Sequence, residues 1–278
     1  MMRTVRLPGG DEVVALGQGT WRMGERRGAR KDEVAALQHG IACGMTLIDT
    51  AEMYGSGGSE RVVGEAIRGQ RDKVYVVSKV LPSNAGRKRM KRACEKSLKC
   101  LGTDYLDLYL LHWRSGVSLD ETIEGFLALQ EAGKIRRFGV SNFDTDDMEE
   151  LWETPEGRGC QTNQILYNLT RRWPEASLMP WSRRNGQPLM IYSPLEQGRL
   201  PDGGALGAIA AARGVTTMQV ALAWVLQHED VFVVPKASRI AHVDANLGAL
   251  DIALSDDELA ALDEAFPPPA AHAPLEIL

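Results

Sequence analysis

The sequence contains little cysteine and no long hydrophobic run. Its four cysteines (Cys43, Cys94, Cys100 and Cys160) form no C-x-x-C pair and no metal-like spacing with histidine. We expect them to be reduced thiols, as in the cytoplasm. No apolar run approaches the length of a membrane-spanning helix, and the N-terminal segment lacks the apolar core of a secretion signal. These absences predict a cytoplasmic protein without a membrane partner.

A strong excess of one charge is absent as well. The chain carries 32 Lys and Arg against 37 Asp and Glu, which gives a net charge of -5. This mild acidity provides no electrostatic attraction to nucleic acid, so we expect no nucleic-acid partner. With 44% hydrophobic residues and no low-complexity linker or internal repeat, residues 1–278 are predicted to form a single domain and a monomer.

Short apolar runs of strand character recur along the chain. The first two flank the turn sequence Pro8-Gly9-Gly10-Asp11, which predicts a hairpin formed by Thr4–Leu7 and Glu12–Leu16. Eight further strands are predicted in succession, the first overlapping the end of the hairpin: Ala15–Gly19, Thr46–Ile48, Val74–Val77, Leu106–Leu111, Arg136–Val140, Gln161–Leu166, Leu189–Tyr192 and Val231–Val234.

Helical patterns lie between these strands. From Lys88 to Leu101, apolar residues recur at helical spacing on one face, and mostly basic residues occupy the opposite face. We interpret the basic residues as a solvated helix surface. Two further helix starts are indicated by the capping-box spacings Thr216-x-x-Gln219 and Ser255-x-x-Glu258.

The alternation of strands and helices is compatible with two α/β architectures. Eight parallel β-α units in about 250 residues are typical of a closed (β/α)8 TIM barrel. A doubly wound sheet usually carries G-x-G-x-x-G after its first strand. Here Gly17-Gln18-Gly19-Thr20-Trp21 lacks the third glycine, and no helix follows immediately. We therefore predict a TIM barrel whose N-terminal end is closed by the β-hairpin.

Polar residues stand at the end of every predicted strand. In a TIM barrel the chemistry is located at the carboxyl ends of the strands. A single lysine or histidine there is commonly a solvated or structural residue, but polar residues at eight successive ends converge on one mouth. They are Thr20, Asp49, Ser78-Lys79, His112, Ser141-Asn142, Gln164, Tyr192-Ser193 and Pro235-Lys236.

Four residues of this region have the chemistry needed to reduce a carbonyl with hydride. Tyr54 can give a proton to the developing alkoxide, but the ordinary phenol pKa of about 10 makes it a weak acid. The Lys79 ammonium is predicted to lower that pKa, and Asp49 to keep Lys79 protonated and in place. His112 is predicted to orient and polarise the carbonyl oxygen.

The same region resembles the signatures of the aldo-keto reductase family. The matching segments are Asp49-x-Ala51-x-x-Tyr54-Gly55 with Glu60-x-x-Val63-Gly64-Glu65-Ala66-Ile67, then Asp104–Trp113, Gly133–Phe143 and Pro235-Lys236-Ala237-Ser238. The resemblance extends from the hairpin to the C-terminal segment. It implies a TIM barrel that reduces aldehydes and ketones with NADP(H). The amino-acid sequences of these segments are most similar to those of prokaryotic members that reduce small aldehydes and 2-oxoaldehydes such as methylglyoxal.

This resemblance implies roles for individual residues. Asp49, Tyr54, Lys79 and His112 correspond to a catalytic tetrad in which Tyr54 is the proton donor. The implied cofactor residues are Thr20 and Trp21 at the nicotinamide end, Ser141, Asn142 and Gln164 at the carboxamide, Tyr192 stacked on the ring, Ser193, Leu195 and Gln197 along the pyrophosphate, and Lys236, Ala237 and Ser238 at the adenosine 2′-phosphate.

Two positions at the adenosine end depart from the family pattern. His242 stands six residues after Lys236, where many members have arginine, and Arg239 stands nearer. Either residue is a candidate for the 2′-phosphate contact. Ala245-Asn246 stands where members often have Glu-Asn, so only the contact between Asn246 and adenine is expected.

The substrate is expected to be a small carbonyl compound, in a pocket formed by Trp21, Met53, Trp113 and the segment Phe266–Pro269. Two other functions are open alternatives. A low-turnover NADP(H)-binding regulatory protein could have the same fold, although the intact tetrad argues against it. A metal-dependent hydrolase could use Asp49 and His112, but it needs further histidine or carboxylate ligands at the strand ends, so no metal is expected.

Overall fold

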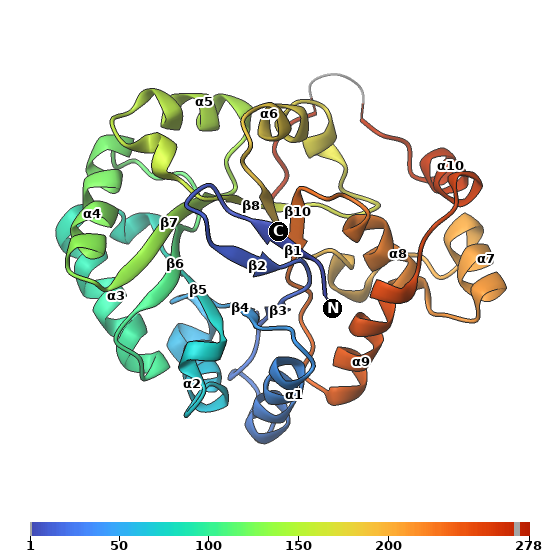
Figure 1. Cartoon of the computed structure of the whole chain (residues 1–278), viewed down its shortest axis with the longest axis horizontal. Helices are drawn as coiled ribbons and strands as arrows, with labels where there is room; N and C mark the ends of the chain where they lie inside the picture. The colour runs from blue at the N-terminus through green and yellow to red at the C-terminus, as the bar shows by residue number, and fades with distance from the viewer. Residues whose placement is uncertain (1, 270–272) are drawn as a thin grey trace.

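Eight parallel strands form a barrel in the order of the chain (Figure 1). The computed structural model describes residues 2–269 and 273–278. Isolated bridges join Leu16 to Val233 and Gly19 to Lys236, which brings the last strand beside the first. The predicted TIM barrel is confirmed. Its strands are β3 (Gln18–Gly19), β4 (Leu47–Asp49), β5 (Tyr75–Val80), β6 (Leu106–Leu111), β7 (Ile135–Ser141), β8 (Asn163–Leu166), β9 (Leu189–Tyr192) and β10 (Val231–Val233).

The predicted antiparallel hairpin, β1 (Thr4–Arg6) and β2 (Glu12–Val14), lies across one end of the barrel (Figure 1). Its buried apolar side chains join the cluster inside the barrel. The backbone N–H of Gly9 donates to Gln161 Oε1, just before β8 begins. The hairpin therefore closes the amino-terminal end of the barrel, as predicted, and leaves the carboxyl ends of the strands for the site.

Helices follow the strands and cover the outside of the barrel. The predicted amphipathic helix is α3, and both predicted capping boxes are formed, by Thr216 at α8 and by Ser255 at α10. Two helices, α7 and α8, stand between β9 and β10. The helices are α1 (Arg30–Ala42), α2 (Gly58–Ala66), α3 (Arg87–Leu101), α4 (Leu119–Glu131), α5 (Thr145–Glu153), α6 (Leu178–Arg184), α7 (Gly204–Arg213), α8 (Thr217–Leu226), α9 (Ile240–Gly248) and α10 (Asp256–Ala265).

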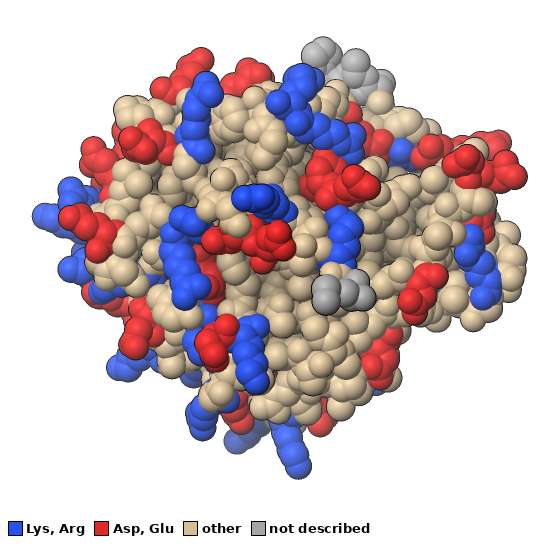
Figure 2. Space-filling model, viewed as in Figure 1, with Lys and Arg blue, Asp and Glu red and all other residues tan. Residues whose placement is uncertain are grey.

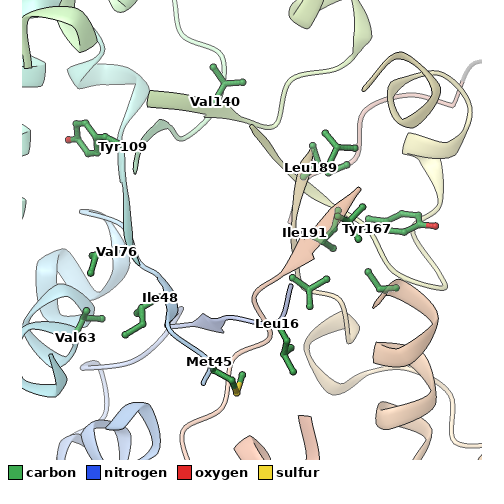
Figure 3. Close-up of a cluster of buried hydrophobic side chains, with 14 of the residues drawn as sticks. Leu16, Met45, Ile48, Val63, Val76, Tyr109, Val140, Tyr167, Leu189 and Ile191 are labelled. Carbon is green, nitrogen blue, oxygen red and sulfur yellow. The ribbon is translucent and has the colours of Figure 1, made fainter. Parts of the chain in front are cut away.

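Side chains of the strands alternate between two apolar layers. In β6, Leu108 and Leu110 belong to the cluster inside the barrel, whereas Tyr109 and Leu111 belong to the outer cluster. Figure 3 shows this outer layer, in which Tyr109 and Val140 point away from the ring of strands. Because the strands are covered on both sides, the polar residues that act on a ligand must lie at the strand ends.

The surface carries charges of both signs. On the face seen in Figure 2, Lys and Arg are interspersed with Asp and Glu. Within the described ranges, no single helix is long and apolar enough to cross a membrane. The bent pair α7 and α8 passes that test only when the two helices are joined across a 98° break.

Candidate active site

The ion pair between Asp49 and Lys79 is the centre of the candidate site. Asp49 ends β4, and Lys79 lies in the neighbouring strand β5. Lys79 Nζ lies 2.8 Å from Asp49 Oδ1 and 2.9 Å from Asp49 Oδ2, and it donates to Thr50 O at 2.8 Å. Both charged side chains are almost completely buried. Burial lowers the pKa of Lys79, and the Asp49 carboxylate acts against that shift. The buried ammonium and the buried carboxylate thus compensate each other's loss of hydration.

Tyr54 reaches this ion pair from the turn that follows β4. It begins the 3-10 helix η1 (Tyr54–Gly57), in which Gly55, Ser56 and Gly57 have φ angles of 54°, 51° and 85°. This left-handed run favours glycine, which explains the glycine directly after the tyrosine. Tyr54 Oη accepts a hydrogen bond from Lys79 Nζ at 3.2 Å.

His112 follows β6 and faces the tyrosine ring. The two ring centroids lie 5.8 Å apart at an interplanar angle of 75°. Burial, and secondly the charge of Lys79, lower the pKa of His112 to about 2, so the imidazole is neutral at physiological pH. Its Nδ1 atom is buried and has no hydrogen-bond partner within the described part of the chain. His112 is thus a neutral polar group beside the phenol.

A chain of hydrogen bonds connects the tetrad to the residues predicted to hold the nicotinamide. Gln164 Nε2 donates to Asp49 Oδ1 at 2.9 Å, and Ser141 Oγ donates to Gln164 O at 2.9 Å. Asn142, with a φ of 58°, accepts from Tyr192 Oη at 2.8 Å and donates to the carbonyl of His112 at 3.0 Å. Each of these side chains therefore has a fixed orientation before any ligand binds.

The loop predicted to lie along the pyrophosphate follows β9. Ser193 and Gln197 have φ angles of 47° and 57°, and Leu195 is half-buried against the outer core. Between them, Glu196 is buried with a φ of 46°. Asn168 Nδ2 donates both to Ser193 O and to Glu196 Oε2 at 2.9 Å. The loop thus has a conformation that side-chain hydrogen bonds hold in place.

The residues predicted to bind the adenosine 2′-phosphate lie between β10 and α9. Lys236 is exposed and donates to Ser238 Oγ at 3.2 Å. Arg239 is the N-cap residue of α9 and provides no side-chain cap to the first turn. Arg239 and His242 are exposed, whereas Ala237 and Asn246 are buried. The structure thus brings exposed cations and uncapped helix N–H groups to one place.

The predicted pocket residues differ in exposure. Thr20 is fully buried, and its hydroxyl donates to Asp49 O at 2.8 Å, so it fixes the end of β4. Trp21 and Trp113 are half-buried, and the Trp113 ring lies 4.9 Å from that of His112. Met53 is 42% exposed. Phe266 is half-buried, and its carbonyl accepts a hydrogen bond from Arg172.

Comparison with known proteins identifies the family. The model of the aldo/keto reductase family matches residues 15–266. The chain belongs to this family. The methylglyoxal reductase YeaE of Escherichia coli (strain K12) is 50% identical over 99% of each chain. A crystal structure of an aldo/keto reductase from Klebsiella pneumoniae in complex with NADP and acetate is 52% identical over 100% of both chains, with a TM-score of 0.96. A structure from the same organism in complex with NADPH has a TM-score of 0.97.

The net pKa of Tyr54 in this aldo-keto reductase differs from the lowered value expected beside Lys79. Lys79 was expected to lower the pKa of Tyr54, yet the pKa of Tyr54 is well above its ordinary value. Burial is the main cause, and the negative charge of Asp49 adds to it. The physical reason is that a phenolate here loses its hydration, while Asp49 already neutralises much of the Lys79 charge. Tyr54 is therefore a firmly protonated phenol in the absence of ligands.

Ser59, Glu60 and Arg171 shape the site but were not among the predicted site residues. Ser59 donates to Thr20 Oγ1 at 2.7 Å, and buried Glu60 accepts from Ser78, the neighbour of Lys79 in β5, at 2.8 Å. Burial raises the pKa of Glu60. Arg171 contacts Glu196 from the loop after β8. Only Glu60 belongs to a segment that resembles a family signature, so only Glu60 had a signal in the sequence.

A metal centre has no support in this geometry. Among the described residues, no group of three or more His, Cys, Asp or Glu side chains is placed to hold a metal ion. The carboxylate of Asp49 is instead engaged by Lys79 and Gln164. All four cysteines are free thiols, and Cys94 and Cys160 are buried.

Proposed function

We propose that this protein reduces aldehydes and ketones to alcohols with NADPH, and that short aldehydes and 2-oxoaldehydes such as methylglyoxal are its preferred substrates. The observation that carries the proposal is the Tyr54 hydroxyl, hydrogen-bonded at 3.2 Å to a lysine that is itself paired with a carboxylate. Membership in the aldo/keto reductase family and 50% identity with the methylglyoxal reductase of E. coli support it.

The adenosine end fits NADPH. Exposed Lys236, with Arg239 at the uncapped start of α9, provides cationic and N–H donors for a dianionic 2′-phosphate. At the other end, Tyr192 has a fixed ring beside the Asn142 carboxamide. When bound, NADPH supplies the hydride. We propose the remaining cofactor contacts as the resemblance implies them, through Trp21, Ser141, Gln164, Ser193, Leu195, Gln197, Ser238 and Asn246.

Each residue of the tetrad has a separate role in proton transfer or in orienting the substrate. The raised pKa of Tyr54 keeps its proton on the phenol until negative charge develops on the substrate oxygen. That proton then moves from Tyr54 Oη to the alkoxide, and the phenolate left behind is stabilised by Lys79, which Asp49 holds in position. Neutral His112 donates a hydrogen bond to the same oxygen and helps to orient the carbonyl.

We also propose that residues 1–278 act as one domain and as a monomer in the cytoplasm. The support for the single domain is that one barrel and one hairpin share the inner apolar cluster. The support for the cytoplasm is the four free thiols. Size-exclusion chromatography with light scattering tests the monomer, because a dimer would have twice the mass of 30.5 kDa.

Oxidation of NADPH, measured with a panel of carbonyl compounds, tests the function. Methylglyoxal and short aldehydes should have higher kcat/KM values than bulky ketones and steroids, because the chain is 50% identical to a methylglyoxal reductase. A higher kcat/KM for a steroid ketone would contradict the proposed pocket. Tight NADPH binding without turnover of any compound in the panel would favour the regulatory alternative.

A further inference from the structure

The C-terminal segment Ala273–Leu278, called the strap below, lies against residues of the proposed cofactor site. Ala273 and Leu275 pack against the outer core. Burial raises the pKa of Tyr192, and a hydrogen bond from the backbone of Leu278 acts against that shift. The strap therefore lies near the tyrosine proposed to stack on the nicotinamide, although it is distant from this residue in the sequence.

Arg171 joins the strap to the loop proposed for the pyrophosphate. Its Nη1 atom lies 2.5 Å from Glu276 Oε2 of the strap, and its Nη2 atom lies 3.3 Å from Glu196 Oε1 of the loop. The two carboxylates differ in environment, because Glu196 is 8% exposed and Glu276 is 33% exposed in their side chains. One guanidinium thus connects a buried carboxylate with a more exposed one.

The link from Glu276 through Arg171 ends at Glu196, whose carboxylate helps to hold the loop in its conformation. Asn168 and Arg199 also hydrogen-bond to its carboxylate, and Asn168 holds the backbone of Ser193 as well. Burial would raise the pKa of Glu196, but the bonds from Asn168, Arg171 and Arg199 outweigh it and keep the pKa below its ordinary value. Glu196 itself has a φ of 46°, a backbone conformation that a non-glycine residue adopts only when its surroundings hold it there.

We propose that Arg171 is a positioning residue that couples the strap to the cofactor loop, so that the Arg171–Glu276 ion pair strengthens NADPH binding without touching the cofactor. The inference rests on the proposed function, since it concerns the same cofactor site. The physical reason is that a loop held in a strained conformation before binding loses less entropy when the ligand binds. The strap supplies part of that restraint through Glu276.

A double-mutant cycle on NADPH affinity tests the coupling. Glu276→Gln should raise the Kd for NADPH about three- to fivefold, the scale of a partly exposed ion pair. Arg171→Met should raise it about tenfold, because buried Glu196 also loses a partner. The double variant should match Arg171→Met alone, because both changes break the same connection. The rate of hydride transfer at saturating NADPH should stay within about twofold of wild type, since the tetrad is intact.

Glu65→Gln is the matched control, because it breaks the ion pair of Arg30 and Glu65 at 2.8 Å by the same change away from the site. It should leave the Kd unchanged. Values within the error of wild type for Glu276→Gln, or effects that multiply in the double variant, would overturn the coupling. If Arg171→Met fails to fold, Glu276→Gln alone decides. Wild-type NADPH binding and methylglyoxal turnover are measured first, so that a failure of the proposed function is recognised separately.

Discussion

The two ends of the proposed site differ in how far the protein alone determines their geometry. At the catalytic end, Asp49, Lys79 and His112 are buried, and hydrogen bonds connect Asp49 and Lys79 to their neighbours. At the adenosine end, Lys236 and Arg239 are exposed, and Ser238 is the hydrogen-bond partner described for Lys236. One end is a dry, connected cluster, and the other is a group of solvated cations.

This difference follows from the cost of burying charge. A buried ammonium must be paired and hydrogen-bonded, so its partners and distances are determined by folding. The ammonium of an exposed lysine forms its hydrogen bonds with water, and its side chain takes a single conformation only when an anionic ligand binds. We therefore expect substitutions at the catalytic end to affect both rate and stability, and those at the adenosine end to affect mainly cofactor affinity.

The largest expected effect is that of Lys79→Met. It removes the cation beside the phenolate and leaves Asp49 buried with fewer partners. Turnover should fall by at least about 10², and the free energy of unfolding should fall by about 3 kcal/mol, as when one partner of a buried ion pair is removed. Steady-state kinetics and urea unfolding measure the two effects. Lys91→Met on the exposed face of α3 is the control and should change neither. Near-normal turnover of Lys79→Met would contradict the role of the ion pair.

Tyr54→Phe should separate the rate of turnover from cofactor affinity at the same end. It keeps the ring but removes the hydroxyl, so turnover should fall by at least about 10², the scale of a lost general acid. The Kd for NADPH, followed by fluorescence, should change less than about threefold, which is under 1 kcal/mol. His112→Ala is the companion variant. Near-normal kcat of Tyr54→Phe beside an inactive His112→Ala would assign the proton donation to His112.

Lys236→Ala tests the adenosine end. Losing a charge-assisted contact costs about 1.5–3 kcal/mol, so the KM for NADPH should rise about tenfold or more. The KM for NADH, which lacks the 2′-phosphate, should remain nearly the same. Kinetics with both cofactors measure the ratio, and the unfolding free energy should be unchanged because Lys236 is exposed. Equal losses with NADPH and NADH would place Lys236 away from the 2′-phosphate.

The same contrast explains what the sequence could and could not predict. The strands and the order of Asp49, Lys79 and His112 along them followed from apolar runs that end in polar residues. The pKa of Tyr54 did not, because it depends on three-dimensional burial rather than on spacing. The contact of Arg171 with Glu276 was also beyond sequence reasoning, because the tail has no periodicity and lies far from Arg171 along the chain.

Strand boundaries show a similar limit. The predicted first strand, Ala15–Gly19, pairs with β4 only at Gln18 and Gly19, while Leu16 pairs with Val233 on the other side. The residues between the hairpin and β4 thus divide their hydrogen bonds between two neighbours. The barrel closes because this segment pairs with β4 on one side and with β10 on the other. A pattern of apolar residues does not predict which residue pairs with which neighbour.

The pH dependence of the free energy of unfolding tests whether His112 is buried away from water at the catalytic end. His112 protonates near its ordinary pKa of about 6.5 in the unfolded chain but only near 2 in the folded protein. Between these values the unfolded state binds more protons, so this contribution to stability decreases as the pH falls. From pH 7 to pH 5 the loss should be about 2 kcal/mol in urea unfolding. His112→Gln should remove most of this loss. Exposed His242→Gln should not, and an equal loss in all three proteins would exclude His112 as its source.

The smallest expected effects distinguish Arg239 from His242 as the second contact to the 2′-phosphate. Arg239 directly follows Ser238, which Lys236 contacts at 3.2 Å, and its planar guanidinium matches the geometry of a phosphate. His242 lies one turn further into α9. Arg239→Ala should therefore raise the KM for NADPH about three- to fivefold, and His242→Ala less than about twofold, with NADH unchanged in both. A larger increase in the KM for NADPH with His242→Ala than with Arg239→Ala would reverse the assignment.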